Sequence, residues 1–230
     1  MSRADPPSIQ SPEPGLESLV SPNNPCPFLR ALVEGGYLSG HIEQLSTIAN
    51  TIVAAGGESA SEPRLPRSRV YLIAMIANGL GPARLARSVR KGVQLDALRG
   101  GPLDKRGTGS RVLRPTGRID EAELARLDQF AIEKIDSSGF AERGLGIHEL
   151  RTMMDANFAR AAGKRRRIDR ALMNGEWPIL LRVMGKTSVD GRYLSLTELR
   201  TLFVEQRLPP RITQRLHSPA APKTLLGFGG

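Results

Sequence analysis

The stretch SPNNPCPFLRALVEGGYLSG, residues 21–40, contains the only cysteine of the chain. Pro25 and Pro27 flank this residue, Cys26, and the apolar residues after it are spaced as in a helix. Pro27 suits the first helical position, because the N–H that proline lacks has no partner there. We therefore predict a helix over residues 27–34, with Cys26 as its N-cap or next to it, and with two glycines as its stop.

The position of Cys26 favours chemistry at its sulfur. The unpaired N–H groups and the dipole of a helix N-terminus both favour a thiolate over a thiol. Such a sulfur can serve as a nucleophile, a redox sensor or a metal ligand. The three histidines form no cysteine-hydrolase signature, and a second cysteine for a redox pair is absent. A thiolate ligand to heme iron needs neither a histidine partner nor a second cysteine. The alternative is that Cys26 is a small buried side chain without a chemical role.

The composition narrows the class of protein. The net charge is +10, but the basic residues are scattered, apart from the run 164–167. This charge favours a nucleic-acid partner, but stacking aromatics and a recognisable reading motif are missing, so we do not expect such a partner. A single cysteine excludes an intrachain disulfide and a cysteine-based zinc cluster. The first residues lack the apolar segment of a signal peptide, and the apolar stretch 70–80 is too short to span a membrane, so we expect a cytoplasmic protein.

The pattern along the chain predicts an all-α fold. Residues 1–24 are proline-rich and predict a disordered leader, residues 25–215 predict a single irregular helical domain, and residues 216–230 predict a loose tail. Helical periodicity recurs almost everywhere and predicts about eight helices, with one short hairpin near Arg192–Leu194. The helix over residues 69–80 is apolar nearly all round, which predicts a central position.

Two further segments stand out. Residues 100–117, GGPLDKRGTGSRVLRPTG, contain five glycines and two prolines. A loop of this length inside a compact domain is usually functional. Ser195 and Glu198 form a capping-box pattern, which predicts a last helix that runs to about Arg207.

The segment PCPFLRALVEGGYL resembles the opening signature of the heme-thiolate peroxidases, the family of chloroperoxidase and the unspecific peroxygenases. The Gly36-Tyr37-Leu38 turn is retained, whereas Gly35 replaces the family's histidine. The stretch GRYLSLTELRTLFVEQRLPPRI is similar to the family's closing segment, so the resemblance spans about residues 25–215. It implies a divergent member in which Cys26 is the proximal ligand of heme b.

The segment LDKRGTGSR in the glycine-rich loop resembles the family's Glu-His-Asp-x-Ser-x-Ser-Arg segment. The resemblance implies that Asp104 and Thr108 bind a magnesium ion beside a heme propionate. Lys105 and Arg106 replace the family's histidine and aspartate. Together with Arg111 they are candidates to pair with the propionates.

The distal side of such a site requires an acid–base group. Glu149 and Asp155, in the predicted helix GIHELRTMMDANFARA, are alternative candidates, and His148 is a third. Alternatively, Glu149 is a solvent-facing helix residue, and Asp155 is a surface i,i+4 or capping partner. The resemblance implies an enzyme that uses hydrogen peroxide to oxidise or oxygenate a small organic substrate, with no membrane partner.

A second interpretation is a degenerate EF-hand protein. The segments IDSSGFAERGLGIHEL and GKTSVDGRYLSLTEL look like EF-hand loops. With Gly191 at the sixth position, Lys186, Ser188 and Asp190 take early ligand positions, and Thr197 stands where a bidentate glutamate is needed. This interpretation predicts a calcium-binding or regulatory protein of poor calcium affinity. A non-catalytic member of the peroxidase family is a further alternative.

Overall fold

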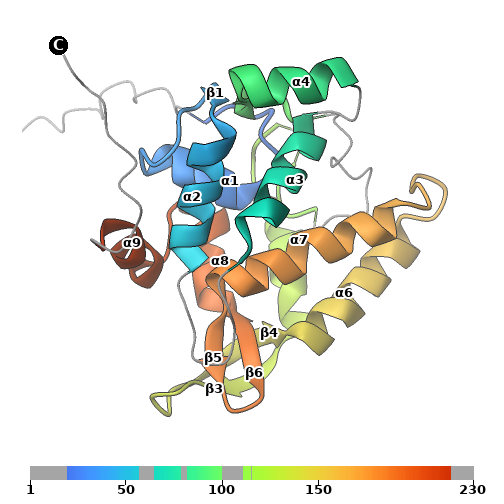
Figure 1. Ribbon diagram of the computed structural model, residues 1–230. Helices are drawn as coiled ribbons and strands as arrows, with labels where there is room; N and C mark the ends of the chain where they lie inside the picture. Colours follow the sequence, from blue (N-terminus) through green and yellow to red (C-terminus); the bar gives the residue numbers. More distant parts are fainter. Residues whose placement is uncertain (1–19, 57–64, 79–81, 100–110, 115, 219–230) are drawn as a thin grey trace, which may run out of the picture.

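The computed structural model describes residues 20–56, 65–78, 82–99, 111–114 and 116–218 (Figure 1). The α-helices are α1 Pro27–Glu34, α2 Leu45–Gly56, α3 Arg67–Asn78, α4 Pro82–Lys91, α5 Glu121–Arg126, α6 Ile147–Arg160, α7 Asp169–Met184, α8 Leu196–Phe203 and α9 Pro210–His217. The strands are β1 Ile42–Glu43, β2 Val93–Gln94, β3 Ile132–Ile135, β4 Ala141–Gly146, β5 Lys186–Ser188 and β6 Gly191–Ser195. Two 3-10 turns are η1 Leu95–Ala97 and η2 Leu127–Gln129.

The first helix begins and ends where the sequence predicts. α1 starts at Pro27, directly after the N-cap Cys26, and its last residue is Glu34. Gly36 has a φ of 72°, a left-handed conformation that glycine reaches without strain. The prediction for this helix is confirmed, and its apolar face is buried in the core.

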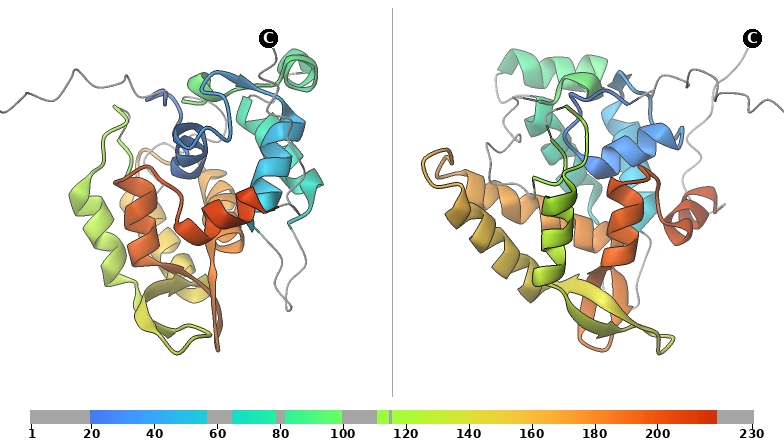
Figure 2. Two further views of the ribbon diagram at one scale, coloured as in Figure 1. Left: turned by 90° about the vertical axis from the view of Figure 1, so that its left-hand side faces the viewer. Right: turned by 180° about the vertical axis from the view of Figure 1, so that it is seen from behind.

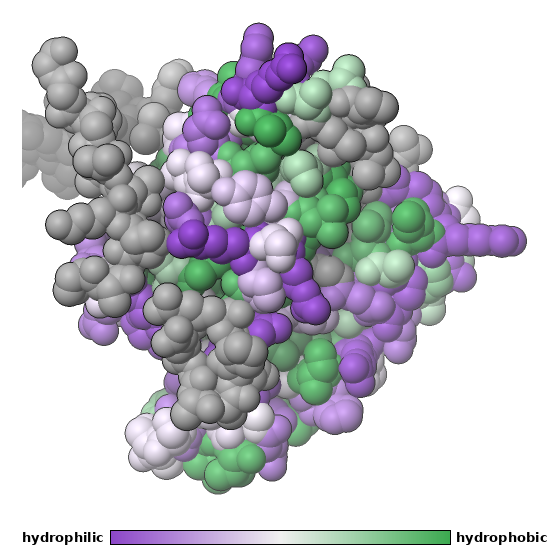
Figure 3. Space-filling model, viewed as in Figure 1, coloured by the Kyte–Doolittle hydropathy of each residue, from purple (hydrophilic) through white to green (hydrophobic). Residues whose placement is uncertain are grey.

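The structure corrects the expectation for the apolar stretch 70–80. Its described part belongs to α3, which packs on α2, α4 and β2. Among the described side chains of α3 only Val70 is buried, and Leu72 is 54% exposed. Figure 3 shows apolar surface over α3 in the middle of this face. A helix that is apolar nearly all round has no polar face for solvent, so packing on one side leaves apolar surface uncovered.

The all-α prediction is wrong, because the protein also contains two antiparallel sheets. β1 pairs with β2, and the other strands form a sheet in the order β3-β4-β6-β5. This larger sheet curls, so that Asp136 after β3 forms a bridge to Ser188 in β5. Strand β3 explains the error: its buried residue is Lys134, while Ile132 and Ile135 are exposed. The apolar alternation that normally indicates a strand is therefore missing.

The larger sheet and the helices α6 and α8 form two hairpin–helix units. The hairpin β3–β4 leads directly into α6, and the hairpin β5–β6 leads directly into α8. The sequences GIHELRTMM at residues 146–154 and SLTELRTLF at residues 195–203 repeat one pattern. Leu145 pairs with Leu194, the equivalent residue of the other unit, so a pseudo-twofold axis passes through this pair. Figure 2 shows the sheet at one end of the molecule, with helices above it.

The end of the described chain differs from the expectation. α8 stops at Phe203 rather than near Arg207, and a separate helix, α9, begins at Pro210. Proline at the first position of α9 again suits a helix start. Among the described residues, no helix is long and apolar enough to cross a membrane.

Candidate functional site

Cys26 is the N-cap of α1, as the flanking prolines predict. Its backbone is extended, with φ −93° and ψ 112°, and no side chain among the described residues caps this helix. Cys26 thus stands at the end of α1 where the first N–H groups have no partner within the helix. Cys26 is half-buried and packs against the core.

The loop before Cys26 is fixed by hydrogen bonds. Asn24 is buried, and its Oδ1 accepts a hydrogen bond from the Cys26 N–H at 3.1 Å. The Asn24 N–H donates to Ser21 O at 3.1 Å. On the other side, Cys26 O accepts the first helical hydrogen bond from the Arg30 N–H at 3.0 Å. The backbone on both sides of the sulfur is thus held in place.

The two ends of the glycine-rich loop lie beside this segment. The Arg99 N–H donates to Asn23 O at 2.9 Å, and its Nε donates to Pro22 O at 3.3 Å. Its Nη2 donates to Arg114 O at 2.8 Å, which joins one end of the loop to the other. A Cβ added at Gly117 would lie 3.2 Å from Pro22 Cβ. The loop therefore starts and ends next to the Pro-Cys-Pro segment.

The closing segment of the chain reaches the same region. α8 packs on α1, and Gln206, which follows α8, accepts a hydrogen bond at Oε1 from Arg30 Nη2 at 3.0 Å. Tyr37, in the turn after α1, lies against His217 at the end of α9, with ring centroids 5.6 Å apart. The three segments that carry the resemblance are thus neighbours in the fold.

Arg30 joins these segments, and the sequence analysis missed it. This side chain is buried, and its Nη1 donates to Ser21 O at 2.8 Å. A signal was available, because Arg30 is a single charged residue within the apolar run PFLRALV, residues 27–33. Charged residues are rarely buried without a specific partner, so such a position merits attention.

The predicted ligands in the glycine-rich loop are described only in part. Four of them lie outside the described residues: Asp104, Lys105, Arg106 and Thr108. Arg111 is described, is half-buried and has a φ of 60°. Burial and the charge of Arg160 lower the pKa of Arg126, Glu123 raises it, and the charge of Arg111 lowers it again, so Arg111 lies near Arg126.

Glu149 lies at the junction of α6 with the larger sheet. Its Oε2 accepts a hydrogen bond from the Gly146 N–H at 2.8 Å and lies 3.6 Å from Lys134 Nζ. The Glu149 side chain is 15% exposed. These contacts help to start α6 and neutralise the buried ammonium of β3. The role of Glu149 as a distal acid stays a prediction.

Asp155 lies on the surface of α6. Its side chain is 66% exposed and forms an ion pair with Arg170 of α7 at 2.7 Å. The described hydrogen bonds and ion pairs of Glu149 and Asp155 lie within the sheet, α6 and α7, and none of them reaches the Cys26 segment. The structure therefore brings neither carboxylate into contact with Cys26.

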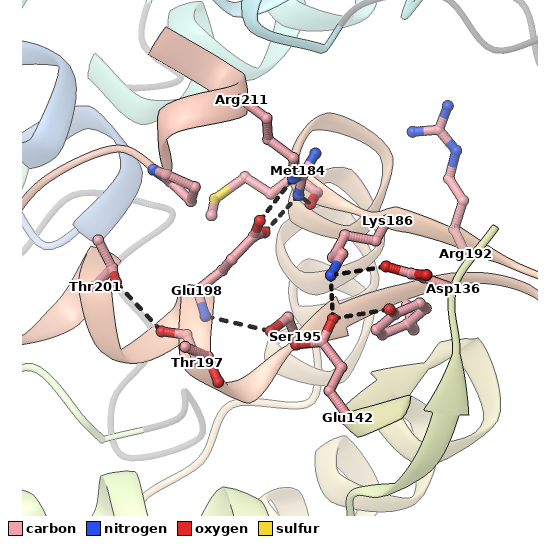
Figure 4. Close-up of polar contacts among 12 residues, drawn as sticks. Asp136, Glu142, Met184, Lys186, Arg192, Ser195, Thr197, Glu198, Thr201 and Arg211 are labelled. Atoms are coloured by element: carbon pink, nitrogen blue, oxygen red, sulfur yellow. Dashed lines mark hydrogen bonds and ion pairs between the residues drawn. The ribbon is translucent and has the colours of Figure 1, made fainter. Parts of the chain in front are cut away.

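The two segments that resemble EF-hand loops form β-hairpins. Ser188 Oγ donates to Gly191 O at 2.9 Å within its own turn. Lys186 Nζ contacts Glu142 and lies 3.4 Å from Asp136 (Figure 4). An ammonium thus lies between the carboxylate oxygens that a calcium ion would require as ligands, so the geometry does not favour calcium binding.

Glu142 is the centre of this hydrogen-bond network. It accepts from Lys186, from Tyr193 Oη at 2.8 Å and from Ser195 Oγ at 2.5 Å. Burial acts to raise the pKa of Glu142, but the hydrogen bonds from Lys186, Ser195 and Tyr193 outweigh burial and lower it. Burial and then the bond to Glu142 raise the pKa of Tyr193 to about 12. The Tyr193 phenol is therefore held in its protonated form as a donor to Glu142.

Glu198 occupies the position in the second unit that Glu149 occupies in the first. Its carboxylate binds Arg211 of α9, with Nε 2.6 Å from Oε1, and Arg211 also donates to Met184 O (Figure 4). The Glu198 N–H donates to Ser195 Oγ at 3.4 Å. The N-cap half of the predicted capping box is therefore confirmed, and the carboxylate half is replaced by the ion pair.

The residues around Cys26 fit one side of a heme site. A thiolate ligand requires a fixed sulfur near N–H donors, and the N-cap position supplies both. Arg30, in α1, and Arg99, whose N–H donates to Asn23 O, add positive charge to this region, which suits the propionate carboxylates of heme. In the part of the chain that the structure describes, no three His, Cys, Asp or Glu side chains gather to hold a separate metal ion.

Comparison of the chain with family models, with curated proteins and with solved structures finds no match in any of the three.

Proposed function

We propose that this protein binds heme b through Cys26 and acts as a heme-thiolate peroxidase or peroxygenase. The observation that carries the proposal is the convergence of three distant segments on the N-terminus of α1. The ends of the glycine-rich loop contact the residues before Cys26, and the closing segment contacts Arg30 through Gln206. Only the Pro-Cys-Pro segment provides a thiol, because the chain has a single cysteine.

The chain's own residues would act on the proximal side. Cys26 would hold the iron as a thiolate, because its sulfur lies at the positive end of α1. Asn24 holds the backbone of Cys26 through the Cys26 N–H. When bound, heme supplies the redox chemistry by which hydrogen peroxide oxidises or oxygenates a small organic substrate. Arg111, Lys105 and Arg106 would bind the propionates, with magnesium at Asp104 and Thr108.

Proton transfer on the distal side requires an acid–base group. Glu149 and Asp155 are its candidates, but each has a structural partner in Lys134 or Arg170. A distal role requires the carboxylate to face the peroxide, within hydrogen-bond reach of it. Glu149→Gln and Asp155→Asn, assayed separately, identify which one transfers the proton, since only that variant loses peroxide-dependent activity.

The proposal is tested by peroxide-dependent oxidation of a small aromatic substrate. Cys26→Ser is the critical variant, because serine is a good N-cap and preserves the start of α1 while it removes the thiolate. At equal heme content we expect the wild type and Thr197→Ala, exposed on α8, to be active and Cys26→Ser to lose activity. Equal activity of Cys26→Ser and wild type, or a folded wild type that takes up no heme, would overturn the proposal.

A further inference from the structure

Arg30 is a buried cation whose described hydrogen bonds go only to neutral acceptors. The residue is 5% exposed, and its Nε is buried without a hydrogen-bond partner. Nη1 donates to Ser21 O at 2.8 Å, and Nη2 donates to Gln206 Oε1 at 3.0 Å. Taking a charge out of water is costly, so buried charges are normally paired with an opposite charge. Among the described residues, no carboxylate forms an ion pair with Arg30.

A second positive charge lies close to Arg30. Burial lowers the pKa of Arg30, the charge of Arg99 lowers it further, and Glu34 compensates only in part. Arg99 itself is bound through its guanidinium to two backbone carbonyls, those of Pro22 and Arg114. Two guanidinium groups are thus held near each other by the residues that precede Cys26 and by the ends of the glycine-rich loop.

The surroundings of Arg30 also restrain its geometry. Gln206 has a φ of 52°, a conformation that is unfavourable for a residue with a side chain, and it holds Arg30 Nη2 in this conformation. Gly117 brings the backbone close, because a Cβ added there would lie 3.6 Å from Arg30 Nη2. Residues held in uncommon backbone conformations tend to occur at functional sites.

We propose that Arg30 and Arg99 form a carboxylate-binding site beside Cys26, and that the carboxylate in the heme-bound protein is a heme propionate. The identity of the ligand rests on the proposed function, whereas the site itself rests on the unpartnered Arg30 Nε. A carboxylate matches a guanidinium because its two oxygens accept two parallel N–H bonds. A free carboxylate ligand would use the same chemistry, so the experiment separates the two sources.

The first arm uses the heme-free protein and sodium propionate, with sodium chloride at equal ionic strength as the reference. We expect propionate to raise the Tm of the wild type and of Arg118→Gln, which removes an exposed charge from the same region. Arg30→Gln and Arg99→Gln should show no such rise. If Arg30→Gln does not fold, as circular dichroism will show, Arg99→Gln, at a half-buried position, provides the comparison. An absent rise in the wild type, or an equal rise in both site variants, overturns the carboxylate site.

The second arm compares hemin with its dimethyl ester, in which both propionates are blocked. We expect hemin to bind about ten- to a hundredfold more tightly than the ester in the wild type and in Arg118→Gln, as for the loss of a charge-assisted hydrogen bond. In Arg99→Gln and Arg30→Gln the two affinities should approach each other. An unchanged preference in these variants assigns the site to a free carboxylate and overturns the propionate assignment.

The two arms distinguish failure of this inference from failure of the proposed function. A propionate effect that depends on Arg30, in a protein that binds no heme, refutes the proposed function and leaves the carboxylate site intact. A thiolate-bound heme together with no propionate effect refutes the carboxylate site and leaves the proposed function intact.

Discussion

At the scale of single residues, β4 approaches the ring of Tyr193 closely at Gly144. A Cβ added at Gly144 would lie 2.3 Å from Tyr193 Cδ2. The ring is fully buried, and its hydroxyl is bound to Glu142. Because the ring is fixed at both ends, it has little room to move away.

We therefore expect Gly144→Ala to destabilise the protein by roughly 1–3 kcal/mol through overpacking. Gly56→Ala, at the last residue of α2, is a matched control. A Cβ added there would lie 3.8 Å from Val183 Cα, which is an ordinary contact. Alanine in a helix is favoured over glycine, so this control should be neutral or gain up to about 1 kcal/mol. Urea denaturation measures both changes, and equal stabilities of the two variants would contradict the packing described here.

Single residues also show which parts of the site could be predicted. The position of Cys26 followed from two prolines and an apolar run, because these signals are local. Arg30 and Gln206 lie far apart in the sequence, and only the folded chain brings them together. The EF-hand interpretation places Lys186 at an early ligand position, whereas the structure shows it as the cation bound by Glu142. An ammonium has no oxygen for calcium, so the residue type already argued against that ligand position.

At the scale of elements, the paired hairpins are joined by a network of charges. Lys186 of β5 binds Glu142 of β4 and Asp136 at the end of β3. Helix starts were predictable from proline and serine caps, as for α1 and α8. The hairpin predicted near Arg192–Leu194 is present as β5–β6. Strand β3 was not predicted, because its buried member is Lys134, a residue type normally found on the surface. The repeat of residues 146–154 and 195–203 is visible in the sequence and would have been the signal for two equivalent units.

This network predicts how stability depends on pH. The hydrogen bond from Ser138 and then the Phe140 N–H lower the pKa of Asp136 from 3.8 to about 2, and the pKa of Glu142 is also lowered. A carboxylate with a lowered folded-state pKa stabilises the protein above its unfolded-state pKa, and this contribution is lost as pH falls through the folded-state pKa. Stability should therefore fall between about pH 5 and pH 2.

The test is the free energy of unfolding measured across this range of pH. Glu142→Gln and Asp136→Asn should each show a shallower fall than the wild type, because the titrating group is gone. Glu133→Gln, at an exposed position of β3, should keep the slope of the wild type. Identical slopes in all four proteins would mean that the network does not contribute to acid sensitivity.

At the scale of the whole molecule, the fold differs from the all-α prediction, but it brings together the segments that resemble heme-thiolate peroxidases. The helical periodicity of the sequence predicted an all-α domain, and the curled sheet corrects that expectation. The closing segment that carried part of the resemblance is the second of the two hairpin–helix units. The three segments that carry the resemblance are nevertheless in contact around α1. For the molecule as a whole we therefore propose a proximal heme site at Cys26.

The most direct test of this claim is the absorption spectrum of the reduced, heme-loaded protein under carbon monoxide. Thiolate ligation predicts a strongly red-shifted Soret band in the wild type. Cys26→His should bind heme through imidazole and lose that shift, and Cys26→Ser should lose it while the fold is kept. The account is contradicted if the folded wild type lacks the red-shifted band, or if Cys26→Ser retains it.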